Sequence, residues 1–283
     1  MTKNSIWITG ASGRLGNVLK SVLKNNVDYR VIPTDEEVDV SSLEDVQAHA
    51  DLYRPNIIIN CAALSNEEYC ETHKAQAYKV NAIGARNLAI VSRKLNAKII
   101  QISTDDVFNG AGENVWNEFD QPSPISVYGK SKLAGEQFVR ELNPKHLIIR
   151  SSWVYGKGKS DYFSFVEEKG KNGESFEAVV NEISSPTNSK TLAKFIVSML
   201  NSNEYGIYHA SCEGKCSRFE YAQAILSNLG YDPTLVKAVV DTEGKNNSAL
   251  LDNLMMEIME NYTMPHWKDD LNDYIANLKG GKK

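Results

Sequence analysis

Short apolar runs, rich in isoleucine and valine, alternate with longer helical patterns along the first half of the chain. This alternation is typical of βαβ units, in which successive strands join one parallel sheet. The run NIIINCA at 56–62 is apolar almost throughout, as expected for a central strand buried on both faces. The segment at 41–53 begins with Ser41 and has Glu44 three residues later, which predicts a capping box. The expected strands are 5–9, 29–33, 56–62, 98–103 and 146–152, and the expected helices among them are 14–24, 41–53 and 73–95.

Beyond residue 152 the expected elements are shorter and their order is less regular. We therefore expect an α/β protein with a Rossmann-type, doubly wound parallel sheet mainly in residues 1–152. Residues 153–283 are expected to form mainly a smaller C-terminal α/β lobe that is interleaved with the core. The patterns behind this expectation are helices at 161–171, 189–201, 218–229 and 269–278 and strands at 176–180 and 206–211.

Composition limits the classes of partner. The chain of 283 residues has a formal net charge of -5, so it lacks the basic excess that neutralises phosphates, and we expect no nucleic-acid partner. No apolar run approaches the roughly 18 residues that span a bilayer, and the N-terminus lacks the zones of a signal peptide. A cytoplasmic protein without a membrane partner is expected. The four scattered cysteines form neither a disulfide framework nor a paired metal-ligand motif, so no metal site is expected.

A glycine-rich turn follows the first expected strand. Gly10, Gly13 and Gly16 stand in ITGASGRLG, directly before the first expected helix. Glycines at this place permit a tight turn and let the backbone approach a pyrophosphate at the helix N-terminus. The spacing is G-x-x-G-x-x-G, whereas ordinary dehydrogenases have G-x-G-x-x-G. We interpret the turn as a dinucleotide cradle, with a plain glycine-rich βα turn as the alternative.

The end of the second strand carries the candidates for the adenosine side of such a cofactor. Asp35 is at about the right distance to bind the ribose hydroxyls, and a carboxylate there repels a 2′-phosphate and so favours NAD. Arg14, inside the glycine loop, could instead bind that phosphate, and the choice between NAD and NADP stays open. Asp39 and Val40, just ahead of the next helix, are candidates to flank the adenine.

A tyrosine and a lysine four residues apart are the candidate proton-transfer pair. Tyr128 and Lys132 lie one turn apart on one helix face, so the lysine cation can stabilise the phenolate and hold the nicotinamide ribose. Such a pair alone is common in helices. Ser103 and Thr104, however, end a strand at the carboxyl edge of the sheet, where open α/β proteins bind ligands. We therefore interpret the glycine loop, Ser103, Thr104 and the tyrosine–lysine pair as one reductive site.

These segments resemble the extended short-chain dehydrogenase/reductase superfamily and, within it, the dTDP-4-dehydrorhamnose reductase family. The resemblance spans nearly the whole chain, and ISTDDVFNG, YGKSKLAGE and RSSWVYG are its most specific motifs. The other matching segments are TGASGRLG, NCAALSNEE, KVNAIGARNLA, SSPT, GIYHAS and PHWKDDLNDYI.

The resemblance implies reduction of the C4 ketone of a nucleotide-linked 6-deoxy-hexulose, with NADH or NADPH as cofactor and Tyr128 as general acid. No metal is implied, because the tyrosine and threonine donors polarise the carbonyl. The catalytic set is Thr104, Tyr128 and Lys132. The glycine loop and the resemblance together place these residues along the cofactor: Gly10, Ser12, Gly13, Arg14, Leu15, Gly16, Asp35, Asp39, Val40, Cys61, Ala62, Ala63, Asn81, Ser103, Tyr128 and Lys132. The expected substrate residues are Ser65, Thr104, Asp105, Val107, Phe108, Trp153, Ser185, Pro186 and Thr187.

The chain departs from the family pattern on the substrate side, where the family usually has tyrosine at Asp106, aspartate at Asn109, glycine at Ser184 and Arg-Pro at 244–245. A dTDP-linked sugar is the expected partner, but another nucleotide or keto sugar fits the pattern too. Two other functions stay open: a non-catalytic, dinucleotide-binding regulatory subunit like the methionine adenosyltransferase β subunit, and a sugar-nucleotide epimerase or dehydratase. The helix at 73–95 and the helix of Tyr128 could also form a homodimer interface.

Overall fold

The computed structural model describes residues 4–24, 26–110, 114–158, 161–242, 249–260 and 262–280. Within these ranges, a six-stranded parallel sheet forms the core, with the order β2-β1-β3-β4-β6-β11. The expected doubly wound α/β fold is confirmed. The strands of this sheet are β1 (Asn4–Thr9), β2 (Tyr29–Thr34), β3 (Ile57–Asn60), β4 (Lys98–Thr104), β6 (His146–Ser151) and β11 (Gly206–His209).

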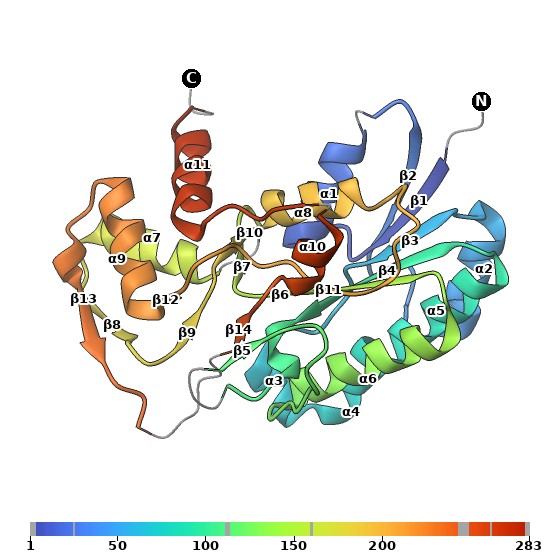
Figure 1. Cartoon of the computed structure of the whole chain (residues 1–283), viewed down its shortest axis with the longest axis horizontal. Helices are drawn as coiled ribbons and strands as arrows, with labels where there is room; N and C mark the ends of the chain where they lie inside the picture. Colours follow the sequence, from blue (N-terminus) through green and yellow to red (C-terminus); the bar gives the residue numbers. More distant parts are fainter. Residues whose placement is uncertain are drawn as a thin grey trace.

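Helices cover both faces of the sheet (Figure 1). Successive side chains of a strand point to opposite faces, so Ile6 and Ile8 of β1 pack with α1 and α8, whereas Trp7 packs with α2 and α5. Both faces are apolar because both are covered. The helices on the first face are α1 (Arg14–Lys24), α8 (Ser189–Ser198) and the short α10 (Leu254–Met259), and those on the second are α2 (Leu43–Tyr53), α5 (Gly84–Lys94) and α6 (Val127–Leu142).

A second hydrophobic cluster holds the smaller lobe together, at the left of Figure 1. Its helices pack around aromatic side chains and the parallel pair β8–β13. The chain returns from this lobe to the core for α8 and β11, so the two parts are interleaved; the boundary at residue 152 stays a prediction. The lobe contains α7 (Tyr162–Asn172), β8 (Phe176–Val179), α9 (Arg218–Leu229), the 3-10 helix η3 (Pro233–Leu235), β13 (Val236–Val239) and α11 (Trp267–Gly280). The short strands β5 (Val115–Trp116), β7 (Val154–Tyr155), β9 (Ile183–Ser184), β10 (Thr187–Asn188), β12 (Cys216–Ser217) and β14 (Leu250–Leu251) pair as β5–β14, β7–β10 and β9–β12.

The start of α2 differs from the expectation by one residue. Ser42 is the N-cap and accepts a hydrogen bond from the backbone N–H of Asp45 (3.3 Å). Ser41 is engaged elsewhere, because its backbone N–H and its hydroxyl both donate to Asp39 (2.8 and 2.6 Å). The predicted capping box of Ser41 and Glu44 is therefore wrong, and the aspartate before it explains why.

The long helix expected at 73–95 is a continuous helical segment whose middle is a π-helical turn. It consists of α4 (Lys74–Tyr78), η1 (Lys79–Ile83) and α5, and the short α3 (Glu67–Thr72), which was not expected, precedes it. A single π turn inside an α-helix often marks a functional site. Here it lies against α6 at Gly135, where a Cβ would lie 2.5 Å from the carbonyl oxygen of Asn81.

The strand order reverses at β1, which has β2 on one side and β3 on the other. In open α/β sheets the ligand binds at such a switch point, outside the carboxyl ends of the strands. The ends of β1, β3 and β4 therefore define where the site should be. Among the described residues, no helix has the length and apolar character needed to cross a membrane.

Candidate active site

The glycine loop lies at the switch point, between β1 and the first turn of α1. Gly10 has a φ of 62°, and a Cβ there would lie 2.8 Å from the backbone of Cys61 and Ala62, at the end of β3. A Cβ at Gly16 would overlap the carbonyl oxygen of Gly10. Glycine at these positions therefore lets the backbone of the loop pack closely against the end of β3 and against the start of α1. This arrangement fits the pyrophosphate of a dinucleotide.

Asp35 follows β2 and is tied to the glycine loop. Its Oδ1 accepts hydrogen bonds from the backbone N–H and the hydroxyl of Ser12, both at 2.9 Å. The carboxylate is thereby held beside the cradle, at the place where a ribose would be expected. Arg14 faces the other way: its Nε lies 3.3 Å from the carboxylate of Asp161 and its Nη1 donates to the carbonyl oxygen of Val154 (3.3 Å).

Three other cofactor candidates serve mainly local structure. Hydrogen bonds from Ser41 lower the pKa of Asp39, so its carboxylate is held in its own turn. Val40 is buried against Gly84, and Leu15 lies in the core cluster beside α8. Contacts of these residues with an adenine stay a prediction.

Lys132 is buried next to the end of β4. Its ammonium group donates a hydrogen bond to the carbonyl oxygen of Ile102 (2.7 Å). Burial lowers the pKa of Lys132 to about 8, while Glu136 and Cys61 act to raise it. Burial raises the pKa of the Cys61 thiol to about 12, so Cys61 is a neutral neighbour. Most Lys132 side chains therefore keep their charge at neutral pH, and the ammonium has further N–H groups with which to bind ribose hydroxyls.

Tyr128 lies one helical turn before Lys132, and the side chain of Thr104 acts to lower the pKa of its phenol. Burial, together with the carboxylates of Asp106 and Asp105, raises the pKa of Tyr128 well above its ordinary value. The phenol therefore stays protonated at neutral pH, which is the state required of a proton donor. Thr104 Oγ1 lies 2.9 Å from Asp106 Oδ2 and 3.1 Å from Asp105 Oδ1. A hydroxyl has one proton, so it donates to one of these oxygens at a time.

Asn81 connects the π turn to the site. Its side-chain amide bonds both backbone groups of Leu64, with the oxygen accepting from the N–H (2.8 Å) and the nitrogen donating to the carbonyl (2.9 Å). The same nitrogen donates to the hydroxyl of Ser131 (2.9 Å), which donates to the carbonyl oxygen of Tyr128 (2.8 Å). Asn81 therefore fixes the loop after β3 against the helix that carries Tyr128.

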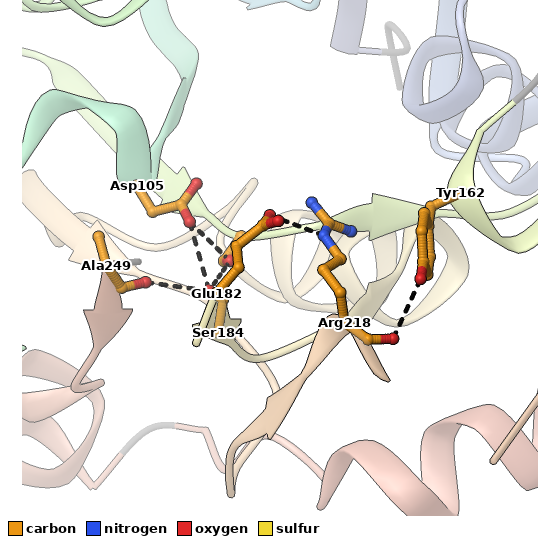
Figure 2. Close-up of polar contacts among 7 residues, drawn as sticks. Asp105, Tyr162, Glu182, Ser184, Arg218 and Ala249 are labelled. Atoms are coloured by element: carbon orange, nitrogen blue, oxygen red, sulfur yellow. Dashed lines mark hydrogen bonds and ion pairs between the residues drawn. The ribbon is translucent and has the colours of Figure 1, made fainter. Parts of the chain in front are cut away.

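Residues that follow β6, together with residues of the lobe, form a cluster of aromatic and charged side chains. Trp153 follows β6 with a φ of 41°, a conformation that is rare for a bulky side chain and is typical of functional sites. The guanidinium of Arg218 lies 3.5 Å from the ring centre of Trp153 and 4.9 Å from that of Tyr162. Its Nε donates to Glu182 (2.7 Å), and its carbonyl oxygen accepts from the Tyr162 hydroxyl (3.1 Å), as Figure 2 shows.

Carboxylates from three separate elements act on one another near Thr104. Desolvation, followed by the charges of Asp106 and Glu182, raises the pKa of Glu67 to about 7, although Glu67 keeps exposed surface. Arg218 acts in the opposite direction. The carboxylate of Asp106 thus lies on the side of the site where the chain departs from the family pattern, and the raised pKa of Glu67 reduces the negative charge that Glu67 adds there at neutral pH.

Asp105 is buried beside these groups. Its Oδ2 accepts from the hydroxyls of Ser152 (2.7 Å) and Ser184 (3.3 Å), as Figure 2 shows for Ser184. Burial, together with the charge of Asp106, raises the pKa of Asp105 to about 7. The Ser184 hydroxyl also lies 2.9 Å from the carbonyl oxygen of Ala249, and its one proton is donated either there or to Asp105.

The remaining substrate candidates differ in exposure. Ser65 is exposed, as is the cofactor candidate Ala63. Val107 and Phe108 are fully buried, and Phe108 stacks on Trp116 with ring centres 5.0 Å apart. Ser185, Pro186 and Thr187 are also buried, and Thr187 accepts a hydrogen bond from the backbone N–H of Cys212 (3.0 Å). A contact between substrate and the buried members would require rearrangement, and their substrate roles stay predictions.

Several residues of this site were not expected from the sequence. The sequence could have indicated Glu136, because it follows Lys132 by one helical turn. Positions 244–245 lie outside the described residues. Within the described ranges, no cluster of three His, Cys, Asp or Glu side chains could hold a metal ion. The other unexpected residues come from distant segments: Glu67 lies within the matching segment NCAALSNEE, whereas Tyr162, Glu182 and Arg218 lie in no motif.

Comparison with known proteins gives consistent matches over nearly the whole chain. The model of the RmlD substrate binding domain family matches residues 4–279. The spore coat polysaccharide biosynthesis protein SpsK of Bacillus subtilis is 34% identical and covers 97% of both chains, and a dTDP-4-dehydrorhamnose reductase of Aggregatibacter actinomycetemcomitans is 34% identical over 78% of this chain and 77% of its own length. The crystal structure of a dTDP-4-dehydrorhamnose reductase from Bacillus anthracis in complex with NADP superposes with a TM-score of 0.93 at 37% identity, covering 97% of this chain and 99% of that one.

Proposed function

The chain belongs to the RmlD substrate binding domain family, and on that premise we propose that it reduces the C4 ketone of a nucleotide-linked 6-deoxy-hexulose with NADPH or NADH. The relatives that carry the name dTDP-4-dehydrorhamnose reductase support this reaction class, and a dTDP-linked sugar is the proposed substrate. The observation that carries the proposal is the placement of Tyr128 one helical turn before the buried Lys132, whose ammonium group bonds the carbonyl oxygen of Ile102 in β4, the strand that ends in Thr104.

The proposed mechanism assigns each of these side chains one task. A bound nicotinamide supplies the hydride to the carbonyl carbon. Tyr128 transfers its phenolic proton to the carbonyl oxygen, which leaves a secondary alcohol on the sugar and a phenolate on the enzyme. Lys132 stabilises that phenolate by its charge, and the Thr104 hydroxyl donates a hydrogen bond to the same oxygen when it turns away from Asp106.

The cofactor is expected to lie along the edge formed by β1, β3 and β4. Gly10 and Gly16 allow the tight backbone turn at the helix N-terminus where the pyrophosphate is proposed to bind, and Asp35 and Lys132 are the proposed partners of the adenosine ribose and the nicotinamide ribose. Asn81 holds the loop after β3 in position.

A matrix of two cofactors and several substrates tests the reaction. The protein is mixed with NADPH or NADH and with dTDP-4-keto-6-deoxy-L-mannose, its UDP counterpart, or the 4-keto-6-deoxy-D-glucose isomer. Absorbance at 340 nm is followed, and the product is identified by mass spectrometry, which should show a gain of two hydrogens. Cofactor binding without turnover of any keto sugar would reject the proposal and favour a regulatory, dinucleotide-binding role.

The carboxylate of Asp35 is expected to discriminate against NADPH. In Asp35→Ala the repulsion of a 2′-phosphate is lost, so the ratio of kcat/KM for NADPH to that for NADH should rise roughly tenfold, or about 1.4 kcal/mol. Steady-state kinetics with both cofactors measures this ratio. Glu36→Ala, which removes an exposed carboxylate next to it, is the control and should leave the ratio unchanged. An unchanged ratio in Asp35→Ala would place the ribose elsewhere.

A further inference from the structure

Glu136 continues the helix face that carries the proton-transfer pair. Tyr128, Lys132 and Glu136 follow one another at a spacing of four in α6, so they lie on one side of the helix. Glu136 is 3% exposed, and its Oε1 accepts a hydrogen bond from the hydroxyl of Ser103 (2.5 Å). Ser103 directly precedes Thr104 at the end of β4. The Glu136 carboxylate therefore contacts the end of β4 through the hydroxyl of Ser103.

The opposite side of Glu136 is closed by Arg150 of β6. The guanidinium Nε lies 3.0 Å from Oε1, and Nη2 lies 2.7 Å from Oε2. Arg150 Nη1 lies 3.3 Å from Nε2 of His209 on β11. Burial and the charge of Arg150 lower the pKa of His209 to about 3, so His209 is neutral and adds no charge.

The buried charges around Lys132 can therefore be counted. Two cations, Lys132 and Arg150, face a single carboxylate, Glu136, within this cluster. An arginine does not lose its proton in proteins, so without Glu136 the lysine would be the group that becomes neutral. The other titratable groups facing Lys132 or Tyr128 are Cys61 from β3, which is a neutral thiol, and Asp105, Asp106 and Glu67 from the opposite side, which act on Tyr128.

We propose that Glu136 is a positioning residue of the reductase site, whose carboxylate keeps the Lys132 ammonium charged and orients the Ser103 hydroxyl. This inference rests on the proposed reduction for its catalytic consequence only. The ionisation of Lys132 and the affinity for the cofactor can be measured without any turnover, so a failure of the proposed reaction and a failure of this role can be told apart.

The test compares the full-length protein with Glu136→Gln, which keeps the shape of the side chain and removes its charge. NMR of the lysine 13Cε and 15Nζ atoms, assigned with Lys132→Arg, follows the ionisation of Lys132 between pH 6 and pH 10, with and without saturating NADPH. The midpoint for Lys132 should fall by about one pH unit or more. The Kd for NADPH, measured by fluorescence, should begin to rise at a correspondingly lower pH, and so should the alkaline loss of kcat/KM.

Two variants keep the proposal open to refutation. Glu141→Gln removes the same charge from an exposed position of the same helix and should leave the midpoint unchanged. Glu136→Asp retains the charge and should keep the Lys132 midpoint near that of the parent protein, even if the cofactor binds less tightly. A folded Glu136→Gln whose Lys132 midpoint is unchanged would overturn the proposal. A fall of the Lys132 midpoint in Glu136→Asp would overturn the proposal as well. This second test can be made even if Glu136→Gln does not fold.

Discussion

Replacing Tyr128 by phenylalanine is expected to lower kcat/KM for the keto sugar by about 10³-fold, which corresponds to about 4 kcal/mol of transition-state stabilisation. The substitution removes the proton donor and leaves the ring that packs beside α3 and α4. The Kd for NADPH should change by less than about threefold, because Lys132 and the glycine loop remain. Stopped-flow absorbance at 340 nm for the chemical step and fluorescence titration for cofactor binding separate the two effects.

The dependence of kcat/KM on pH gives a second test of the role of Tyr128. The pKa of Tyr128 is raised well above its ordinary value by burial and by Asp106, so the phenol should not lose its proton below pH 9. The loss of activity on the alkaline side should therefore follow Lys132, whose pKa is about 8. A residual activity in Tyr128→Phe that exceeds about a tenth of the parent value would assign the proton to another donor. Tyr78→Phe, at an exposed position of α4, is the matched control and should retain full activity.

The parts of the site that the sequence predicted are those that depend on local spacing. Three glycines after a strand dictate a close approach of backbone, and the structure places Gly10 against Cys61 and Ala62. A spacing of four puts Tyr128 and Lys132 on one helix face whatever the tertiary fold. The parallel sheet was predictable for a similar reason, since the central strands β1 and β3 consist mostly of buried apolar residues and helical patterns follow them along the chain.

The parts that the sequence did not predict depend on contacts between distant segments. Arg218 reaches Trp153 only because the β9–β12 pair brings the start of α9 next to the end of β6. The π turn at Asn81 is set by hydrogen bonds to Leu64, which no helical periodicity encodes. The raised pKa of Glu67 likewise arises from burial by the folded chain and from charges on other elements. Asn81 and Trp153 were candidates from the sequence, but these contacts leave no pattern in the chain, so only the folded structure identifies them.

The largest loss of stability is expected from Arg150→Met. Arg150 is 1% exposed and forms a bidentate ion pair with Glu136, with its guanidinium 5.1 Å from the ring centre of Phe108. Methionine fills much of the volume and supplies no charge, so Glu136 loses its bidentate guanidinium partner and keeps only the Ser103 hydroxyl and the charge of Lys132. Removing one member of a buried ion pair costs about 3–5 kcal/mol of unfolding free energy. The melting temperature should fall by about 6 °C or more, as measured by calorimetry.

The origin of that loss can be separated from lost packing by a second substitution. The double variant Glu136→Leu/Arg150→Met removes both charges, and replacing a buried pair by apolar side chains is often close to neutral. It should therefore melt above Arg150→Met, although it has lost more hydrogen bonds. Lys94→Met, which breaks the exposed pair with Asp51 (3.2 Å), is the control and should cost less than about 1 kcal/mol. If the double variant were no more stable than Arg150→Met, the cost would lie in packing around Phe108, and the broken ion pair would not be its cause.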